Sequence, residues 1–339
     1  MKIYGFWNNK GGTGKTSLSF QTATAYAHAH PDEKILTVDV CPQANLSELL
    51  LGGLVNGGST RLLEIQGGLV RATIGGYFQL RLPSPYSPPT FDPRDFITHP
   101  SDFNDAIPTN IDLLAGDPLL ELQANAISTL ANNQIPGTNS WIAVIDWLSD
   151  FLAGIQDEYD TVFVDANPSF SIYTQIALST VELLVLPVMA DDSSRRAIQN
   201  AFSLIYGLKL PSDIYLAYAF PTKLREAGRP LPKVHSIVKN RLTQYMGPSS
   251  AYASVLQSID RDVAQLLVTN PEIFDFTVPA EGMVEIRDFQ TTGVVAFARG
   301  CPFYAMRSGR LEVEGQRIQV NEPYRLDCVA AVDNLASRL

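Results

Sequence analysis

Ten consecutive residues near the start of the chain have the types and the spacing that phosphate chemistry requires. They read Asn8-Asn9-Lys10-Gly11-Gly12-Thr13-Gly14-Lys15-Thr16-Ser17. Glycines let backbone N–H groups approach a phosphate closely, and the start of a helix adds a favourable dipole. Lys15 supplies a positive charge for β- and γ-phosphates, and the Thr16 hydroxyl is a ligand for Mg²⁺. The alternative, a glycine turn with a surface lysine, is disfavoured because strand, loop, Gly-Lys-Thr and helix occur together.

Two aspartates stand where predicted strands end. Asp39 closes the apolar run 34–39, and Asp165 closes the run 159–165. Phosphoryl transfer to water depends mainly on positioning and charge neutralisation. We therefore expect Asp165 to hold Mg²⁺ through water and Asp39 to orient the metal's ligands or the attacking water. The alternative for each is an aspartate that caps the turn after its strand.

The loop and four other segments resemble one family. KGGTGKT at 10–16 resembles the deviant Walker A motif, KGGxGK[TS], of the ParA/MinD group of P-loop ATPases, and Asn9 stands where the general P-loop pattern has glycine. DVCPQANLS at 39–47 is similar to DxDPQxNLS, YDTVFVDANPS at 159–169 to the Walker B segment YDxxxIDxPPS, and NIDLLAG at 110–116 to LDLLPG. Val278-Pro279 followed by Glu285 resembles the IPRS…EA stretch more distantly. The resemblance to ParA-type partition ATPases covers most of the chain.

This resemblance implies ATP and Mg²⁺ as cofactors and a homodimer in the ATP state. Lys10 would reach across a nucleotide-sandwich dimer to the partner's phosphates, although a loop-surface cation is the simpler interpretation of that side chain. Pro279 and residues 220–222 are the candidates for the base pocket. The nucleotide-binding set is Lys10, Gly11, Gly12, Thr13, Gly14, Lys15, Thr16, Ser17 and Pro279, and the metal-binding set is Thr16, Asp39 and Asp165.

Cys41 departs from the family pattern. It stands at the second aspartate of DxDPQ, which by resemblance positions the hydrolytic water. A neutral thiol is a weak acceptor and holds a water less well than a carboxylate does. The catalytic set Lys10, Lys15, Asp39 and Cys41 is therefore expected to hydrolyse ATP slowly, unless a partner supplies the missing group. Asn167 likewise replaces the first proline of the PPS segment.

The charge is unevenly distributed. The chain has 25 lysines and arginines against 35 acids, a net charge of −10. Residues 195–241 carry nine basic residues against two acids, whereas residues 1–194 carry eight against 21. Such a basic segment favours sequence-independent contacts with DNA phosphates, and a solvated helix face with ion pairs is the alternative. The DNA-binding candidates are Arg195, Arg196, Lys223, Arg225, Arg229, Lys233, Lys239 and Arg241.

Composition excludes several other classes. With 45% apolar and 18% charged residues, the chain can bury a large core. Three scattered cysteines suit neither a disulfide framework nor a zinc site. The sequence shows no signal peptide and no membrane-length apolar run, so a cytoplasmic, nucleoid-associated protein is expected. A membrane-binding end is disfavoured because the predicted terminal helix 323–339 carries Asp327 and Asp333.

Apolar runs that alternate with helical segments predict an α/β fold, a mostly parallel twisted sheet with helices on both faces. Predicted strands are 2–7, 34–39, 110–116, 159–165, 182–188 and 214–220, and a helix is predicted from 15 to 28. We expect one domain over 1–339, with an irregular insertion at 52–110 after the second strand. The proline cluster at 83–93 is interpreted as a solvated connector.

Together these features predict a dimerising ATPase whose ATP state binds DNA nonspecifically and whose hydrolysis is stimulated by a ParB-like partner. A plasmid or chromosome would be the cargo, or else a protein complex. A metabolic ligase or kinase that acts on a small molecule is the alternative from another class. Its substrate residues would lie in 52–109 or near 223–233, and Lys10 is the feature that separates the two functions.

Overall fold

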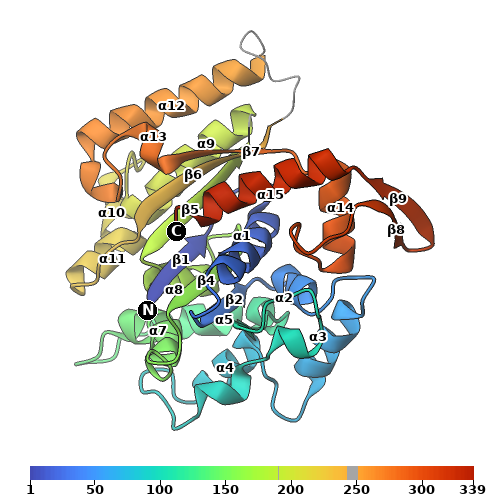
Figure 1. The fold of residues 1–339 in the computed structure, drawn as a ribbon. Coiled ribbons are helices and arrows are strands. Elements are labelled where there is room, and N and C mark those ends of the chain that lie inside the picture. The colour runs from blue at the N-terminus through green and yellow to red at the C-terminus, as the bar shows by residue number, and fades with distance from the viewer. Residues whose placement is uncertain (190, 243–250) are drawn as a thin grey trace.

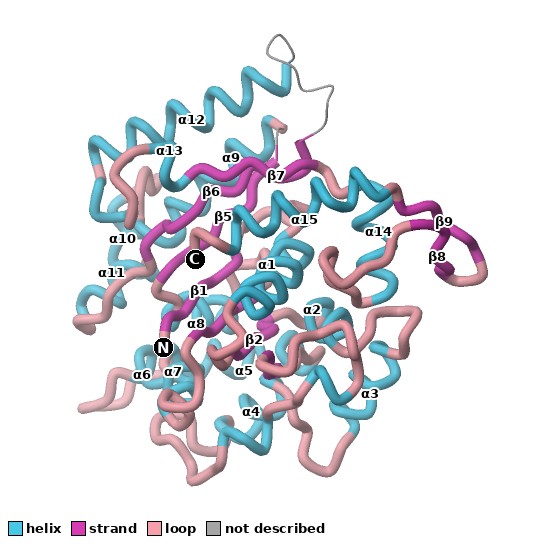
Figure 2. Tube along the Cα trace, viewed as in Figure 1, coloured by secondary structure: helices cyan, strands magenta, loops and turns pink. Residues whose placement is uncertain are grey.

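Seven parallel strands form a single twisted sheet at the centre of the molecule (Figures 1 and 2). The structure is a computed structural model that describes residues 1–189, 191–242 and 251–339, with the backbone alone considered at 192–195 and 251–252. The strand order is β3-β2-β4-β1-β5-β6-β7. The strands are β1 (Lys2–Phe6), β2 (Ile35–Val40), β3 (Ile111–Leu114), β4 (Thr161–Ala166), β5 (Leu183–Met189), β6 (Lys233–Leu242) and β7 (Met283–Arg287). The predicted fold class is confirmed.

Successive side chains of the central strands pack alternately into two separate hydrophobic cores, one on each face of the sheet. Ile3 of β1 and Trp7 directly after it belong to one core, whereas Tyr4 and Phe6 of β1 belong to the other. Because both faces are covered, the strands are apolar at nearly every position, and this explains why unbroken apolar runs predicted them. The covered sheet leaves its carboxyl edge as the place where the loops after the strands meet.

Each core is closed by its own set of helices. One face is covered by α1 (Lys15–Ala29), α2 (Asn45–Leu50), α14 (Gln290–Arg299) and α15 (Glu322–Ala336). The other is covered by α4 (Ile74–Arg81), α5 (Leu119–Ala131), α6 (Ser140–Ile145), α7 (Trp147–Ala153), α8 (Ile172–Thr180), α9 (Asp192–Tyr206), α11 (Phe220–Glu226) and α12 (Ala251–Thr269). Figure 1 shows α1 and α15 in front of the sheet. This layered arrangement brings the carboxyl ends of β1, β2, β4, β5 and β6 together.

The predicted strand at 214–220 is wrong. These residues form α10 (Asp213–Tyr218) and the start of α11, and α10 buries none of its side chains. The strand that pairs with β5 at this place in the sheet is β6. The sequence analysis did not predict it because polar residues interrupt its apolar pattern. Lys239 in its middle is buried but forms ion pairs with Asp260 at 2.8 Å and Glu285 at 3.5 Å, from elements distant in the sequence.

Residues 52–110 are more regular than predicted. They contain α3 (Gly58–Gly67), α4 and two short 3₁₀-helices, Pro93–Phe96 and Pro100–Asp102. Ile74, Tyr77 and Phe78 of α4 are fully buried in the core of one face. The proline-rich stretch is also tied down, because Trp147 Nε1 donates a hydrogen bond to the Pro85 carbonyl at 2.9 Å. The segment is therefore packed against the sheet.

The last third of the chain adds a hairpin and a closing helix. The hairpin consists of β8 (Gly309–Val313) and β9 (Gln316–Val320), which pair antiparallel apart from the main sheet. The predicted terminal helix is confirmed as α15, which packs on α1 and β7 through Cys328, Val332 and Leu335. Among the described residues, the helices lack the combined length and apolar character that crossing a bilayer demands.

A buried ion pair offers a test of how the 52–110 segment is attached. Arg81 is fully buried, donates to Asp150 at 2.6 Å and to the Tyr77 hydroxyl at 2.9 Å, and lies over the Trp147 ring. We expect Asp150→Ala to lower the free energy of unfolding by about 3 kcal/mol, because it leaves the buried guanidinium without its counter-charge.

Urea unfolding monitored by tryptophan fluorescence measures this effect, with Asp157→Ala, an exposed aspartate, as the control. A loss no larger than that of the control would mean that Arg81 does not depend on Asp150.

Candidate functional site

The phosphate-binding loop lies at the carboxyl edge of the sheet, between β1 and α1. Gly12 and Gly14 have φ angles of 75° and 84°, in the left-handed region that favours glycine. Gly14 is the N-cap of α1, and a Cβ added at Gly11 or Gly12 would meet no atom within 4 Å. Open space therefore faces the N-terminal end of a 15-residue helix, as an incoming phosphate requires.

Two asparagines fix the loop to the strands beside it. Asn8 is buried, donates through Nδ2 to the Pro187 carbonyl of β5 at 2.7 Å, and accepts from the Lys10 backbone N–H at 3.0 Å. Asn240, at the end of β6, donates to the Thr13 carbonyl at 2.9 Å. Pro187 of β5 and Asn240 of β6 thus hold the loop at two points, so the sheet determines the loop's shape.

Lys15 lies inside the curve of this loop. Its side chain is buried, and its ammonium donates to the Lys10 carbonyl at 3.0 Å. Burial lowers the pKa of Lys15, while the nearby Asp165 carboxylate opposes that shift. An ammonium removed from water in this way interacts strongly with any anion that enters the loop.

The predicted metal ligands come together at the ends of β2 and β4. Asp39 and Asp165 are direct register partners, and the Thr16 hydroxyl donates to Asp165 Oδ2 at 2.8 Å. Asp39 Oδ2 accepts from the Ser47 N–H at 2.9 Å and from its hydroxyl at 2.8 Å. The Oδ1 atoms of both aspartates are buried without a hydrogen-bond partner among the described residues.

Burial of this pair shapes its protonation. Burial raises the pKa of Asp39 to about 6 and, together with repulsion from Asp39, that of Asp165 to about 7. Two oxygen ligands without partners and an adjacent hydroxyl are the donors that Mg²⁺ prefers. The residues present therefore fit a magnesium ion that is completed by water and phosphate oxygens. Within the described ranges, no group of three or more His, Cys, Asp or Glu is arranged to hold a metal by itself.

Cys41 adjoins the two carboxylates. Burial and the charges of Asp39 and Asp165 raise the pKa of its thiol to about 12, so it stays neutral near pH 7. Asn167 is the other departure from the family pattern. Its side-chain Nδ2 donates to Cys41 Sγ at 3.5 Å, and its backbone carbonyl accepts from Trp7 Nε1 at 2.9 Å. The two unusual residues are thus in contact with each other.

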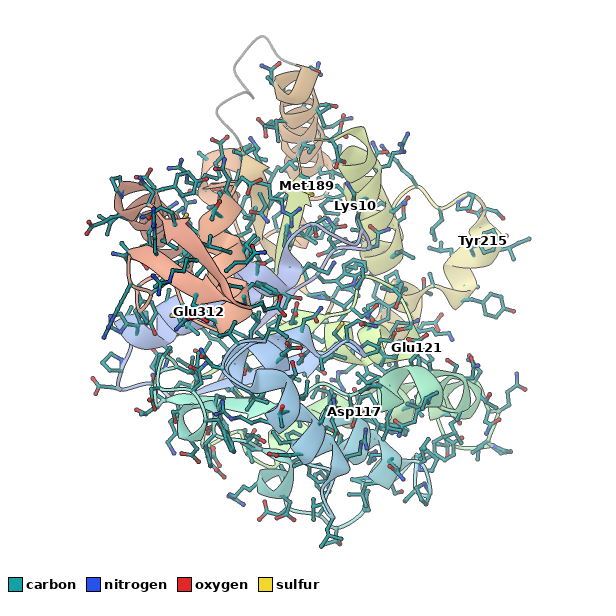
Figure 3. All side chains as sticks on the ribbon, turned by 90° about the vertical axis from the view of Figure 1, so that its right-hand side faces the viewer. Lys10, Asp117, Glu121, Met189, Tyr215 and Glu312 are labelled. Atoms are coloured by element: carbon teal, nitrogen blue, oxygen red, sulfur yellow. The ribbon has the colours of Figure 1, made fainter. Side chains whose placement is uncertain are left out.

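Lys10, unlike Lys15, forms an ion pair with an acidic side chain. Its Nζ is 2.7 Å and 2.5 Å from the two carboxylate oxygens of Asp191, which follows β5. The Lys10 side chain is 24% exposed. Figure 3, which looks onto this edge of the sheet, shows Lys10 next to Met189 at the end of β5. The cation therefore lies at the rim of the site.

A cleft of about 730 Å³ opens beside the loop. Its lining includes Gly14 and Ser17 of the loop and α1, Asn240 of β6, and Phe289 and Gln290 after β7. Such a volume suits a nucleotide-sized ligand. Arg241 and Gln290, both at the cleft, have positive φ angles of 59° and 44°, a strain that is typical of functional sites.

Sequence reasoning missed most of this cleft. Asn240 lies near the end of β6, a strand that the sequence analysis did not predict, so its position beside the loop could not be recognised. Phe289 and Gln290 follow β7, which the sequence analysis did not predict, and Asp191 depends on the exact end of β5. For Asn240, the usable signal was the apolar pattern of 234–238 before it.

The predicted base-pocket residues lie elsewhere. Pro279 begins α13 (Pro279–Gly282), just before the amino end of β7, and lines a different pocket with Lys239 and Met283. Phe220 is buried at the start of α11, where its ring contacts Trp141 and Phe170. Pro279 thus lies apart from the cleft beside the loop, which is lined by residues after the carboxyl end of β7, and its contact with the base stays a prediction.

The predicted DNA-binding residues do not form one face. Lys239 is buried in the ion pairs described above, Arg229 pairs with Asp146 at 2.7 Å, and Lys223 is half-buried over the Trp141 ring. Arg225 and Lys233 are exposed near the amino edge of the sheet, whereas Arg196 and Arg241 are exposed at the carboxyl edge. The Arg195 side chain lies outside the described part of the structure. The basic residues of 195–241 are therefore divided between the two edges of the sheet, and their contacts with DNA stay a prediction.

Comparison with known proteins agrees with this geometry. Residues 1–210 match the family AAA_31, described as an AAA domain. None of the curated proteins matches the sequence. An ATP complex of a Cyanothece McdA variant has a TM-score of 0.62 at 13% identity, covering 100% of this chain and 96% of that one. A Borrelia burgdorferi plasmid partition protein bound to AMPPNP has a TM-score of 0.56 at 14% identity, covering 100% and 99%.

A metabolic enzyme shares the same fold. Cobyrinic acid a,c-diamide synthase from Mycobacterium smegmatis, with ADP and magnesium, has a TM-score of 0.52 at 15% identity, covering 88% of this chain and 91% of that one. At these identities the likeness concerns the fold, which is that of P-loop NTPases. The predicted resemblance to the ParA/MinD group is confirmed at that level.

The buried aspartate pair predicts a pH dependence of stability. A carboxyl whose pKa is raised in the folded state stabilises that state below its unfolded pKa, and this contribution is lost as the pH rises through about 6 to 7. Asp165→Asn, which mimics the neutral form, should therefore gain stability relative to the natural protein as the pH rises from 5 to 8.

Thermal unfolding in EDTA without nucleotide measures this difference. Asp160→Asn, at the exposed position before β4, is the control. A stability difference between the Asp165→Asn and natural proteins that does not vary with pH would contradict the raised pKa values.

Proposed function

Since the chain belongs to the AAA domain family AAA_31, we propose that it is an ATP- and Mg²⁺-dependent ATPase of the ParA type that dimerises when ATP is bound. The observation that carries the proposal is one cluster at the carboxyl edge. There, the buried Lys15 and the Thr16–Asp165 pair face the loop from inside, while Lys10 faces outward at its rim.

Each residue of this cluster has a definite task in the proposed reaction. Lys15 and the loop N–H groups bind the β- and γ-phosphates. Thr16 and Asp165 would hold Mg²⁺, directly or through water. The cleft beside the loop, which Asn240 also lines, would bind the adenine base of the nucleotide. When bound, the ion neutralises charge on the phosphate oxygens. Asp39, whose Oδ1 is not engaged by the described residues, orients the attacking water or a water of the metal.

Dimerisation would require Lys10 to change partners. In this chain its ammonium is paired with Asp191, and both side chains are partly exposed, at 24% and 38%. A second triphosphate is a more highly charged acceptor than one carboxylate, so a second protomer that carries ATP could compete for Lys10. The sandwich dimer then depends on the nucleotide state.

The cellular output we propose is DNA segregation. Arg196 and Arg241 are exposed at the same edge as Lys10, so a dimer would double a small basic surface there. Such contacts bind phosphates irrespective of sequence and weaken with salt. A ParB-like partner bound to plasmid or chromosome cargo would then stimulate hydrolysis and release the DNA, and the protein would associate with the nucleoid. A ParA-like ATPase that positions a protein complex would use the same switch.

A metabolic ligase or kinase is the second candidate. The observation in its favour is the fold shared with cobyrinic acid a,c-diamide synthase. The 52–110 segment, where a substrate site was considered, contributes only Leu54 to the cleft beside the loop. Lys10 and its carboxylate partner at the rim have no evident task in such an enzyme, which is why we favour the dimerising ATPase.

Cys41→Asp should raise the basal rate of ATP hydrolysis several-fold, because a carboxylate at this position can orient the attacking water. The same variant should be less stable without Mg²⁺, since it adds a third acid beside Asp39 and Asp165. Phosphate release under saturating ATP measures the rate, with Cys41→Ser as the control for loss of the thiol. An unchanged or lower rate in Cys41→Asp would argue against this role.

DNA retention provides the test of the whole proposal. We expect the natural protein to be retained on duplex DNA with ATP and not with ADP, and retention to fall along a salt series. Lys10→Ala should abolish retention and the ATP-dependent dimer while nucleotide binding persists, whereas Lys34→Ala, at an exposed site before β2, should change neither. Retention and oligomeric state that are the same with ATP, with ADP and without nucleotide would shift the weight to the small-molecule enzyme.

A further inference from the structure

A second pocket lies far from the nucleotide cleft, near the amino edge of the sheet. It measures about 830 Å³ and is formed by the segment before and into α6 together with α10 and α11. Because α11 leads into the start of β6, the pocket is at the opposite end of that strand from Asn240 and the phosphate loop. Figure 1 shows α10 and α11 at the left margin of the molecule, beyond the sheet.

Ser140 marks this pocket as a site with an unmet hydrogen bond. Ser140 is one of the lining residues and is only 3% exposed, and its enclosed Oγ has no hydrogen-bond partner among the described residues. Leaving a buried hydroxyl unpaired is unfavourable, so native structures usually supply a partner for it. A ligand in the pocket would supply that partner once the Ser140 side chain turns toward it.

Lys223 adds a cation to the same pocket. Its Nζ is 5.2 Å from the centre of the Trp141 ring, and burial lowers its pKa. Within the described ranges, no carboxylate forms an ion pair with it. A half-buried ammonium over an aromatic ring is a favourable partner for an anionic group that enters the pocket.

An exposed apolar helix continues from the pocket's rim. Tyr218 lines the pocket and is 76% exposed, and its neighbours on α10 are also exposed, Ile214 at 73%, Tyr215 at 59% and Leu216 at 42%. In Figure 3, Tyr215 lies at the margin of the molecule. So many large apolar side chains on one short helix indicate a contact surface.

We propose that this pocket and the exposed face of α10 bind an acidic, partly apolar peptide segment of a partner protein. One carboxylate of the segment accepts hydrogen bonds from Lys223 Nζ and Ser140 Oγ. Its apolar side chains pack on Tyr218 and Ile214. The amide groups of Asn132, Asn133, Gln134 and Asn139, which line the same pocket, bind its backbone. Exposed Arg225 on α11 keeps the surroundings positive and complements an acidic partner.

The shape of the site favours a peptide over DNA. Duplex phosphates are best met by cations that project from a convex surface, whereas Lys223 lies within a pocket against Trp141. Glu226 also lines the pocket and would repel a phosphate backbone and a highly acidic segment alike, so the proposed occupant places a single carboxylate beside Lys223. A peptide offers the mixture of one carboxylate, amides and apolar groups that the lining matches.

Selection from a random heptapeptide display library by the full-length protein tests this proposal. We expect the natural protein to enrich peptides that combine Asp or Glu with apolar residues, and Lys223→Met to lose this enrichment. Fluorescence anisotropy of a labelled enriched peptide then measures affinity. Lys223→Met should weaken binding about tenfold or more, because a charge-assisted hydrogen bond is lost. A copy of the peptide with Asn and Gln in place of its acids should bind comparably weakly.

Three further variants make the result specific. Ser140→Ala removes the unpaired hydroxyl without cost to folding, and Tyr218→Ala changes an exposed ring; both should weaken peptide binding. Lys34→Met, the matched loss of an exposed lysine elsewhere, should not. The proposal is overturned if acidic peptides are not enriched, if Lys223→Met enriches them equally, or if duplex DNA binds in a Lys223-dependent manner and displaces the peptide. These outcomes do not depend on ATP, so they are distinguishable from failure of the proposed ATPase.

Discussion

The structure depends above all on holding two carboxylates, Asp39 and Asp165, side by side and out of water. Register pairing of β2 with β4 forces them together, and burial raises both pKa values. Such a pair is unfavourable unless cations compensate it. Lys15 is one compensating cation. The oxygen atoms around the pair fit Mg²⁺ as the other. The loop, the helix start and the neighbouring strands can be understood as the frame that keeps these groups in place.

The same edge of the sheet gives the two loop lysines different environments. Lys15 is buried and directed into the loop, whereas Lys10 is partly exposed and paired with Asp191 at the end of β5. A difference in exposure of this kind separates a lysine that serves its own nucleotide from one that is available to another molecule. Because Asp191 directly precedes α9, a change in the partner of Lys10 would be felt first at the start of that helix.

The sequence predicted the parts of the fold that are fixed locally. Buried parallel strands are continuous apolar runs, so β1, β2, β4 and β5 were found, and glycines with Lys15 and Thr16 identified the loop. The strand β6 was missed because Lys239, Asn240 and Arg241 read as a polar surface. Only the tertiary structure supplies Asp260 and Glu285 for Lys239, and Thr13 for Asn240. The run 214–220 misled for the opposite reason, since the apolar side chains of 214–218 are exposed and no core covers them.

Both ends of α9 lie beside features with a functional interpretation. Its start follows Asp191, and its end carries Tyr206, whose hydroxyl donates to the Pro232 carbonyl just before β6, while Arg225 of α11 donates to the Tyr206 carbonyl. A ligand near α10 and α11 can influence the nucleotide edge only if it binds one arrangement of α9 better than another. Proximity to a shared helix is therefore a necessary condition for coupling and not a sufficient one. Coupling between the two sites would also be reciprocal. ATP would change the affinity for the peptide by the same factor as the peptide changes the affinity for ATP.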